Sequence, residues 1–166
     1  MKLMRTALPC LAGLMLIAIA PLQTQQLAIK KALTLEIAKK IAAAAEKTAV
    51  ANNFHMFILI MDDGGNLMYL ERMDDAQLGS FEVALEKARS AVYFKRPTKA
   101  FEQALHDQGY TPVLKVPGAM PVEGGIPLVV DGQLVGAIGV SGGNPQQDGI
   151  VSQAGADAFP GIIQSH

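Results

Sequence analysis

The first part of the chain has the hydrophobic pattern of a helix followed by a β-hairpin. Thr34 is a candidate cap for a helix that ends near Asn52, because apolar residues recur on one face and charged residues on the other. Residues 54–61 form an unbroken apolar run, which is typical of a strand buried on both faces. Residues 62–66 have turn chemistry, and residues 67–72 are expected to return as the second strand.

Two more helices are expected in the middle of the chain. Ser80 is predicted to cap a helix with an alanine-rich face that runs to about Phe94. Thr98 is predicted to cap a shorter helix that runs through Asp107. Residues 110–127 are rich in proline and glycine and are too long for a bare connection, so they are a candidate binding loop.

The last part of the chain predicts a second hairpin and a final helix. Residues 126–140 contain two apolar stretches separated by an Asp-Gly pair, which suits a type I′ turn. Asn144, followed by proline, predicts the start of a helix that ends near Phe159, and residues 161–166 are expected to be a loose tail. Tight hairpins imply antiparallel pairing, so we predict a mixed α/β domain of the α+β type.

The N-terminus has the layout of an export signal. Two basic residues precede an apolar run at residues 6–20, which is shorter than the about 20 residues that span a bilayer comfortably. We interpret residues 1–22 as a cleaved signal peptide, with an uncleaved anchor or a buried helix as alternatives. Residues 23–32 then act as a linker to a domain at residues 33–160. This interpretation predicts a periplasmic or secreted protein.

Composition excludes several classes of function. The chain has 14 Lys+Arg against 15 Asp+Glu, so it lacks the basic footprint of a nucleic-acid binder. A single Cys excludes an internal disulfide, Cys-based metal sites and covalent haem attachment through paired cysteines. No nucleophile elbow is present, and nothing in the sequence requires catalysis. Enzymatic activity is left open, with a non-enzyme favoured.

Several segments, in order and spacing, resemble the GlcG/HbpS family of haem-binding proteins. That family also includes the C-terminal domain of PduO-type cobalamin adenosyltransferases. The segments that carry the resemblance are Asp62–Leu67, Glu71–Ala76, Ser80 with Glu86–Ala91, Pro97–Thr98, Gly124–Leu128 and Asp131–Gly142. The resemblance implies a profilin-like fold with a central antiparallel sheet of about five strands flanked by helices. It also implies homo-oligomers and, in some members, non-covalent binding of haem b.

Histidine is the first candidate for haem ligation. A non-covalent haem needs an apolar slot, a basic group near its propionates and usually an axial His, Met, Tyr or Cys. His55 lies at the start of the first strand, His106 near the end of the short helix, and His166 at the terminus. The plain alternative is a histidine that only packs or is solvated. Arg72 is a candidate propionate partner, with a solvated or interface charge as the alternative.

Two glycine-containing loops are expected to form a pocket with the residues near His55. The candidate pocket residues are Gly124, Gly125, Pro127, Ser141 and Gly142. The second loop, at residues 141–144, presents backbone N–H groups ahead of a helix N-terminus, which could hold an anion such as a carboxylate. Close strand packing and an ordinary turn are the alternative for both loops.

One helix offers a weak candidate metal site. Glu82 and Glu86 are four residues apart and could grip an iron ion from one helix face. The favoured alternative is a solvated face, because Lys87 and Arg89 lie on the same helix.

The main functional hypothesis is an exported haem-binding protein that acts in haem sequestration, transport or sensing. A first alternative is an enzyme or accessory factor that acts on a small carboxylate such as glycolate. A second is a structural, oligomerising module that presents its surface to a membrane sensor protein.

Overall fold

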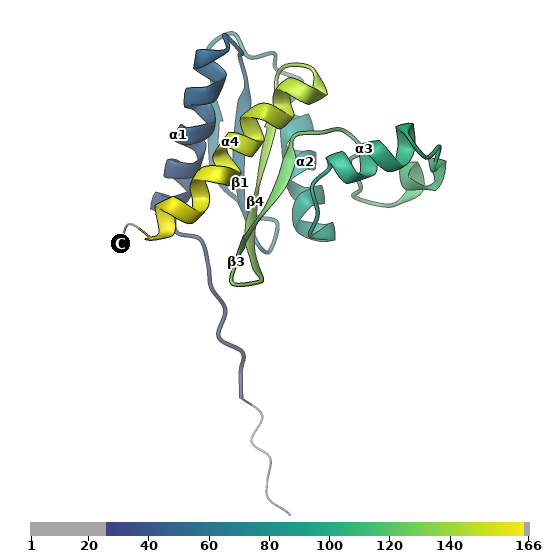
Figure 1. Cartoon of the computed structure of the whole chain (residues 1–166). Helices are drawn as coiled ribbons and strands as arrows, with labels where there is room; N and C mark the ends of the chain where they lie inside the picture. The colour runs from purple at the N-terminus through teal and green to yellow at the C-terminus, as the bar shows by residue number, and fades with distance from the viewer. Residues whose placement is uncertain (1–25, 165–166) are drawn as a thin grey trace, which may run out of the picture.

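A four-stranded antiparallel sheet forms the centre of the domain. The computed structural model describes residues 26–164 (Figure 1), so the predicted signal peptide at residues 1–22 lies outside the described residues. The strands are β1 (Phe57–Asp62), β2 (Leu67–Arg72), β3 (Gly125–Val130) and β4 (Gln133–Ser141). They lie in the order β2-β1-β4-β3, and every pair is antiparallel.

This architecture confirms the α+β class, but residues 26–164 contribute four strands to the sheet and not the expected five or so. The long connection before β3 contains a short 3-10 helix, η1 (Thr111–Lys115), and no strand. Its prolines lack the N–H group that a strand needs for pairing, which explains why it does not extend the sheet.

Helices cover both faces of the sheet. α1 (Leu35–Ala51) and α4 (Pro145–Gln164) pack together on one face, and α2 (Ser80–Phe94) covers the other. The short helix α3 (Lys99–His106) and η1 project from this body as an arm (Figure 1). Among residues 26–164, no helix is both long and apolar enough to cross a membrane.

β1 is the central buried strand. Ile58 and Ile60 belong to the core beneath α1 and α4, while Leu59 and Met61 point to the side covered by α2. This alternation confirms the prediction of a strand buried on both faces. The strand begins at Phe57, three residues later than the apolar run itself.

The capping pattern confirms two helix starts. The Ile37 N–H donates to the Thr34 hydroxyl at 3.3 Å, so Thr34 caps α1 as predicted. At the start of α4, the Gln147 N–H donates to Asn144 Oδ1 at 2.9 Å, and the Asn144 N–H donates to Gln147 Oε1 at 3.0 Å. This reciprocal pair is a capping box.

Two predicted caps are wrong. Ser80 is the first residue of α2, and the residue before it, Gly79, makes no side-chain cap. Thr98 precedes α3, but its hydroxyl accepts from the Gly125 N–H at 3.0 Å and does not cap the helix. Gly79 and Thr98, the residues just before the two helices, have helical backbone angles, whereas a residue that caps a helix with its side chain has an extended backbone.

The turn between β3 and β4 and the C-terminal end of α4 complete the fold. Asp131 and Gly132 have φ of 48° and 74°, which confirms the type I′ turn between β3 and β4. α4 continues through Gln164, so residues 161–164 are helical and not the loose tail expected. Phe159 is buried, and Ile162 and Ile163 pack on the same core, which explains why the helix persists beyond Pro160.

Candidate functional site

One end of the sheet gathers most of the candidate residues. β1 begins and β4 ends there, because Phe57 pairs with Ser141 in the antiparallel register. His55 lies two residues before Phe57, and the Ser141-Gly142 turn leads directly into α4. Arg72, at the end of β2, pairs with Phe57 from the other side. The topology therefore brings His55, Arg72 and Gly142 to the same end of the sheet.

His55 is an exposed imidazole whose orientation is fixed by one hydrogen bond. Its Nδ1 lies 2.8 Å from the carbonyl oxygen of Asp74. A carbonyl can only accept, so Nδ1 is the donor, and in the neutral imidazole the lone pair then lies on Nε2. Metal-ligating histidines typically have this arrangement, in which the second ring nitrogen donates to a backbone carbonyl. His55 is therefore prepared to bind a metal through Nε2.

Two hollows border His55. The first, of about 450 Å³, is lined by Asn53, Phe54, His55, Asp75, Gln77, Gly142, Gly143 and Gln147. The second, of about 340 Å³, is lined by Glu46, Val50, His55, Glu71, Arg72, Met73 and Asp74. Each volume falls within the range of small-molecule sites. The structure thus places His55 with Gly142 on one side and with Arg72 on the other.

Arg72 supplies a positive charge to the second hollow. Its guanidinium carbon lies 5.8 Å from the centre of the Phe57 ring. Such stacking leaves the edge of the guanidinium able to donate to an anion, and a carboxylate is a suitable acceptor. Arg72 can therefore bind a carboxylate beside His55.

The first glycine loop lies away from these hollows. Gly124 has a φ of +129°, and a Cβ there would lie 2.6 Å from the Val140 oxygen and 3.0 Å from Lys87 Nζ. Gly125 packs on the backbone of Lys87, and Pro127 is part of β3, paired with Ala137. The two hollows at His55 therefore include the Gly142 turn but not Gly124, Gly125 or Pro127. The glycines allow the start of β3 to lie closely against α2.

Ser141 and His106 are also separated from the His55 hollows. Ser141 is 5 % exposed and lines neither of them. His106 lies on the arm and borders a different hollow, of about 370 Å³, with Lys99, Glu102, Gln103, Asp107, Glu123 and Gln146. The two candidate histidine ligands therefore do not share a site within one chain.

The weak metal candidate on α2 has too few ligands. Glu86 forms an ion pair with Arg89 of the same helix, a partner that the expected solvated face did not include. Within the described part of the chain, no group of three or more His, Cys, Asp and Glu side chains is placed to hold a metal ion. Glu82 and Glu86 are thus a pair and not part of a larger cluster.

A buried ion pair was missed from the sequence. Lys87 is 0 % exposed, and its Nζ donates to Asp148 Oδ2 at 2.6 Å and to the Val140 carbonyl at 3.1 Å. Asp148 is also buried, and its Oδ1 accepts from the Gly143 N–H at 2.9 Å. The expectation that Lys87 lies on a solvated face is therefore wrong.

The burial of this pair shifts both groups toward their neutral forms. Burial lowers the pKa of the Lys87 ammonium, and the nearby Asp148 carboxylate only partly opposes this. Burial likewise raises the pKa of the Asp148 carboxyl, against the opposing effects of Lys87 and of the Gly142 and Gly143 N–H groups. In both residues the loss of hydration outweighs the attraction.

The sequence contained a signal for Lys87. Its position lies three residues after Ala84 and four before Ala91, inside the stripe of small residues that packs on the sheet. A lysine at such a position requires a buried partner, and the first turn of α4 provides it.

Comparisons with known proteins give a consistent result. The sequence model of one family, described as "Haem degrading protein HbpS-like", matches residues 33–157. Protein GlcG of Escherichia coli (strain K12) is 41% identical over 112 residues, which are 68% of this chain and 83% of that protein.

Solved structures agree with this match. The crystal structure of a double mutant of Streptomyces reticuli HbpS is 31% identical, with a TM-score of 0.72, and the match covers 85% of this chain and 97% of that chain. The crystal structure of a PduOC–haem complex is 28% identical, with a TM-score of 0.70, and the match covers 77% and 95% of the two chains.

Proposed function

Because the chain belongs to the HbpS-like family, we propose that it binds haem b non-covalently, with His55 as the axial ligand. The observation that carries this proposal is the hydrogen bond from His55 Nδ1–H to the Asp74 carbonyl, which leaves Nε2 free for iron. The haem complex of the similar PduOC supports a haem-related role. Bound haem would supply an iron centre capable of one-electron chemistry.

Two features beside His55 suit parts of a haem, although Glu46, Glu71 and Asp74 line the same hollow as Arg72. Arg72 shares a hollow with His55 and can pair with a propionate. On the other side, Gly142 and Gly143 present backbone without side chains, so a flat ring can approach closely. These residues bind and orient the group, and His55 holds its proton on Nδ1.

The alternative of an enzyme acting on a small carboxylate has less support. It would use Arg72 or Ser141, but Ser141 is 5 % exposed and lines neither hollow at His55. Only Arg72 is placed to bind a carboxylate in the manner this alternative requires.

We also propose that the protein is exported and acts in haem sequestration, transport or sensing. The signal-peptide layout of residues 1–22 supports export to the periplasm or the exterior. N-terminal sequencing of the protein from the periplasmic or culture fraction tests it: a start near residue 23 is expected, and an intact Met1 would contradict it.

A homo-oligomer, with a membrane sensor as a further partner, is part of the same proposal. Two shallow hollows, not one deep crevice, border His55, so a second copy could cover the exposed side of a haem. Light scattering with and without haemin tests this part: a multiple of the chain mass is expected, and a monomer in both conditions would contradict it.

A haemin titration tests the proposed function. The purified protein is expected to give a saturable Soret shift at one haem per chain, and His55→Ala is expected to weaken binding at least about tenfold. His106→Ala is the matched control, because this histidine borders a separate hollow. An unshifted, non-saturating spectrum of the wild type would contradict haem binding, and an unchanged His55→Ala spectrum would contradict the assigned ligand.

A further inference from the structure

We infer that Lys87 and Asp148 are positioning residues for the His55 site, an inference that rests on the proposed function. The pair is buried and touches no hollow that contains His55, so it does not contact the ligand itself. It acts through the turn at Gly142 and Gly143, which lines one of these hollows.

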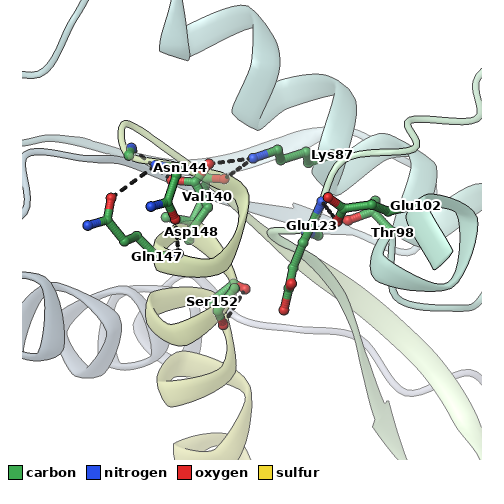
Figure 2. Close-up of polar contacts among 12 residues, drawn as sticks. Lys87, Thr98, Glu102, Glu123, Val140, Asn144, Gln147, Asp148 and Ser152 are labelled. Atoms are coloured by element: carbon green, nitrogen blue, oxygen red, sulfur yellow. Dashed lines mark hydrogen bonds and ion pairs between the residues drawn. The ribbon is translucent and has the colours of Figure 1, made fainter. Parts of the chain in front are cut away.

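The pair makes one contact with the turn and one with the end of β4 that leads into it. The Asp148 carboxylate accepts from the Gly143 N–H at 2.9 Å, and Lys87 Nζ donates to the Val140 carbonyl at 3.1 Å. These two contacts bracket the end of β4, and the 2.6 Å contact between the charged groups joins them (Figure 2). Lys87 comes from α2 and Asp148 from α4, so the turn is tied to helices on both faces of the sheet.

The same turn lies against His55 on its other side. A Cβ at Gly142 would collide with the His55 carbonyl oxygen and would lie 2.8 Å from Met56 Cα. There is no free space between the turn and the backbone that carries the imidazole. A displacement of the turn is therefore transmitted to His55, and with it to the hydrogen bond that fixes the free lone pair on Nε2.

Physical reasoning favours a positioning role over simple stabilisation. Burying two charges loses hydration, and well-packed apolar replacements of such pairs are often equally stable. What an apolar replacement cannot supply is an acceptor for the Gly143 N–H. The pair therefore gives the turn a defined place, in addition to any effect on stability.

The test compares variants of the haem-free protein by NMR. In the wild type, ¹⁵N shifts of His55 are expected to report a proton on Nδ1, and the Gly143 amide is expected to exchange slowly. Lys87→Met/Asp148→Leu is expected to accelerate that exchange at least about tenfold and to give mixed His55 tautomers. The matched control is Lys31→Met/Asp131→Asn, which removes an exposed ion pair elsewhere, keeps a residue that tolerates the positive φ of that turn, and is expected to change neither signal.

A rescue variant separates positioning from general stability. Lys87→Met/Asp148→Asn removes both charges but keeps an oxygen that can accept from Gly143, so it is expected to restore slow exchange and the Nδ1–H tautomer. It also provides the test if Lys87→Met/Asp148→Leu does not fold. The inference is overturned if folded Lys87→Met/Asp148→Leu matches the wild type in both signals. It is also overturned if folded Lys87→Met/Asp148→Asn restores neither signal.

The haem titration of the same variants completes the test. Lys87→Met/Asp148→Leu is expected to bind haemin at least about tenfold more weakly than the wild type. Lys87→Met/Asp148→Asn is expected to bind it at close to wild-type affinity. If the wild type itself binds no haemin, the proposed function fails, whereas the NMR signals of the haem-free proteins still decide the positioning role.

Discussion

Removing one partner of the buried ion pair should destabilise the fold strongly. Lys87→Met leaves the Asp148 carboxylate buried without its cation, and both side chains are almost fully removed from solvent. Loss of one member of a buried pair costs about 3–5 kcal/mol. Asp148 keeps its hydrogen bond from Gly143, so we expect the lower end of that range, about 3 kcal/mol.

Urea unfolding measures this loss. With a denaturant slope of about 2 kcal/mol per molar, the midpoint should fall by about 1.5 M. Two controls define the meaning of the shift. Lys87→Met/Asp148→Leu removes both charges and should recover most of the stability. Lys31→Met breaks an ion pair that is largely exposed, and should cost less than about 1 kcal/mol.

One result would refute the reasoning. If Lys87→Met unfolds at the same urea concentration as the wild type, then Lys87 does not neutralise a buried carboxylate. A double variant as unstable as the single variant would show that packing at these positions, and not the unpaired charge, causes the loss.

Three further predictions concern the same end of the molecule. Gly124→Ala should cost about 2 kcal/mol or more in thermal or urea unfolding, because φ is +129° and the new Cβ meets the Val140 oxygen, and an unchanged midpoint would contradict this. Asn144→Ala removes the α4 cap and should cost about 1 kcal/mol, with a wild-type stability counting against the capping box. Burial raises the pKa of Asp148, so the native state keeps this proton where the unfolded chain has lost it. Lys87 opposes this rise and titrates in the opposite sense, so the comparison is made without it: Lys87→Met should gain stability relative to Lys87→Met/Asp148→Leu as the pH falls from about 7 to 4, and a relative loss would contradict the direction of the shift.

Local patterns were sufficient to predict most of the fold. The Thr34 cap, the type I′ turn and the capping box at Asn144 each depend on residues within a few positions of one another. Thr98 shows where this reasoning stops. Its hydroxyl is used by Gly125, a residue distant in sequence, and nothing near Thr98 indicates that competition.

The candidate site was predictable only where strand pairing determines proximity. His55 and Arg72 come together because Phe57 pairs with Arg72 in the first hairpin, although the register of that pairing shifts between Ile60 and Met61. His106 lies on the projecting arm, whose direction no local pattern reveals (Figure 1). The pairing of Lys87 with Asp148 depends on how α2 and α4 meet across the sheet, so the charge of Lys87 suggested a solvent-facing position.

The most direct test of the account is chemical rescue of the axial ligand. His55→Gly should lose the Soret and electron paramagnetic resonance spectra of the wild-type haem complex, and added imidazole should restore them by replacing the missing ring. His106→Gly should keep the wild-type spectra without imidazole. A His55→Gly protein whose haem spectra equal those of the wild type in the absence of imidazole would contradict the assignment of His55 as the haem ligand.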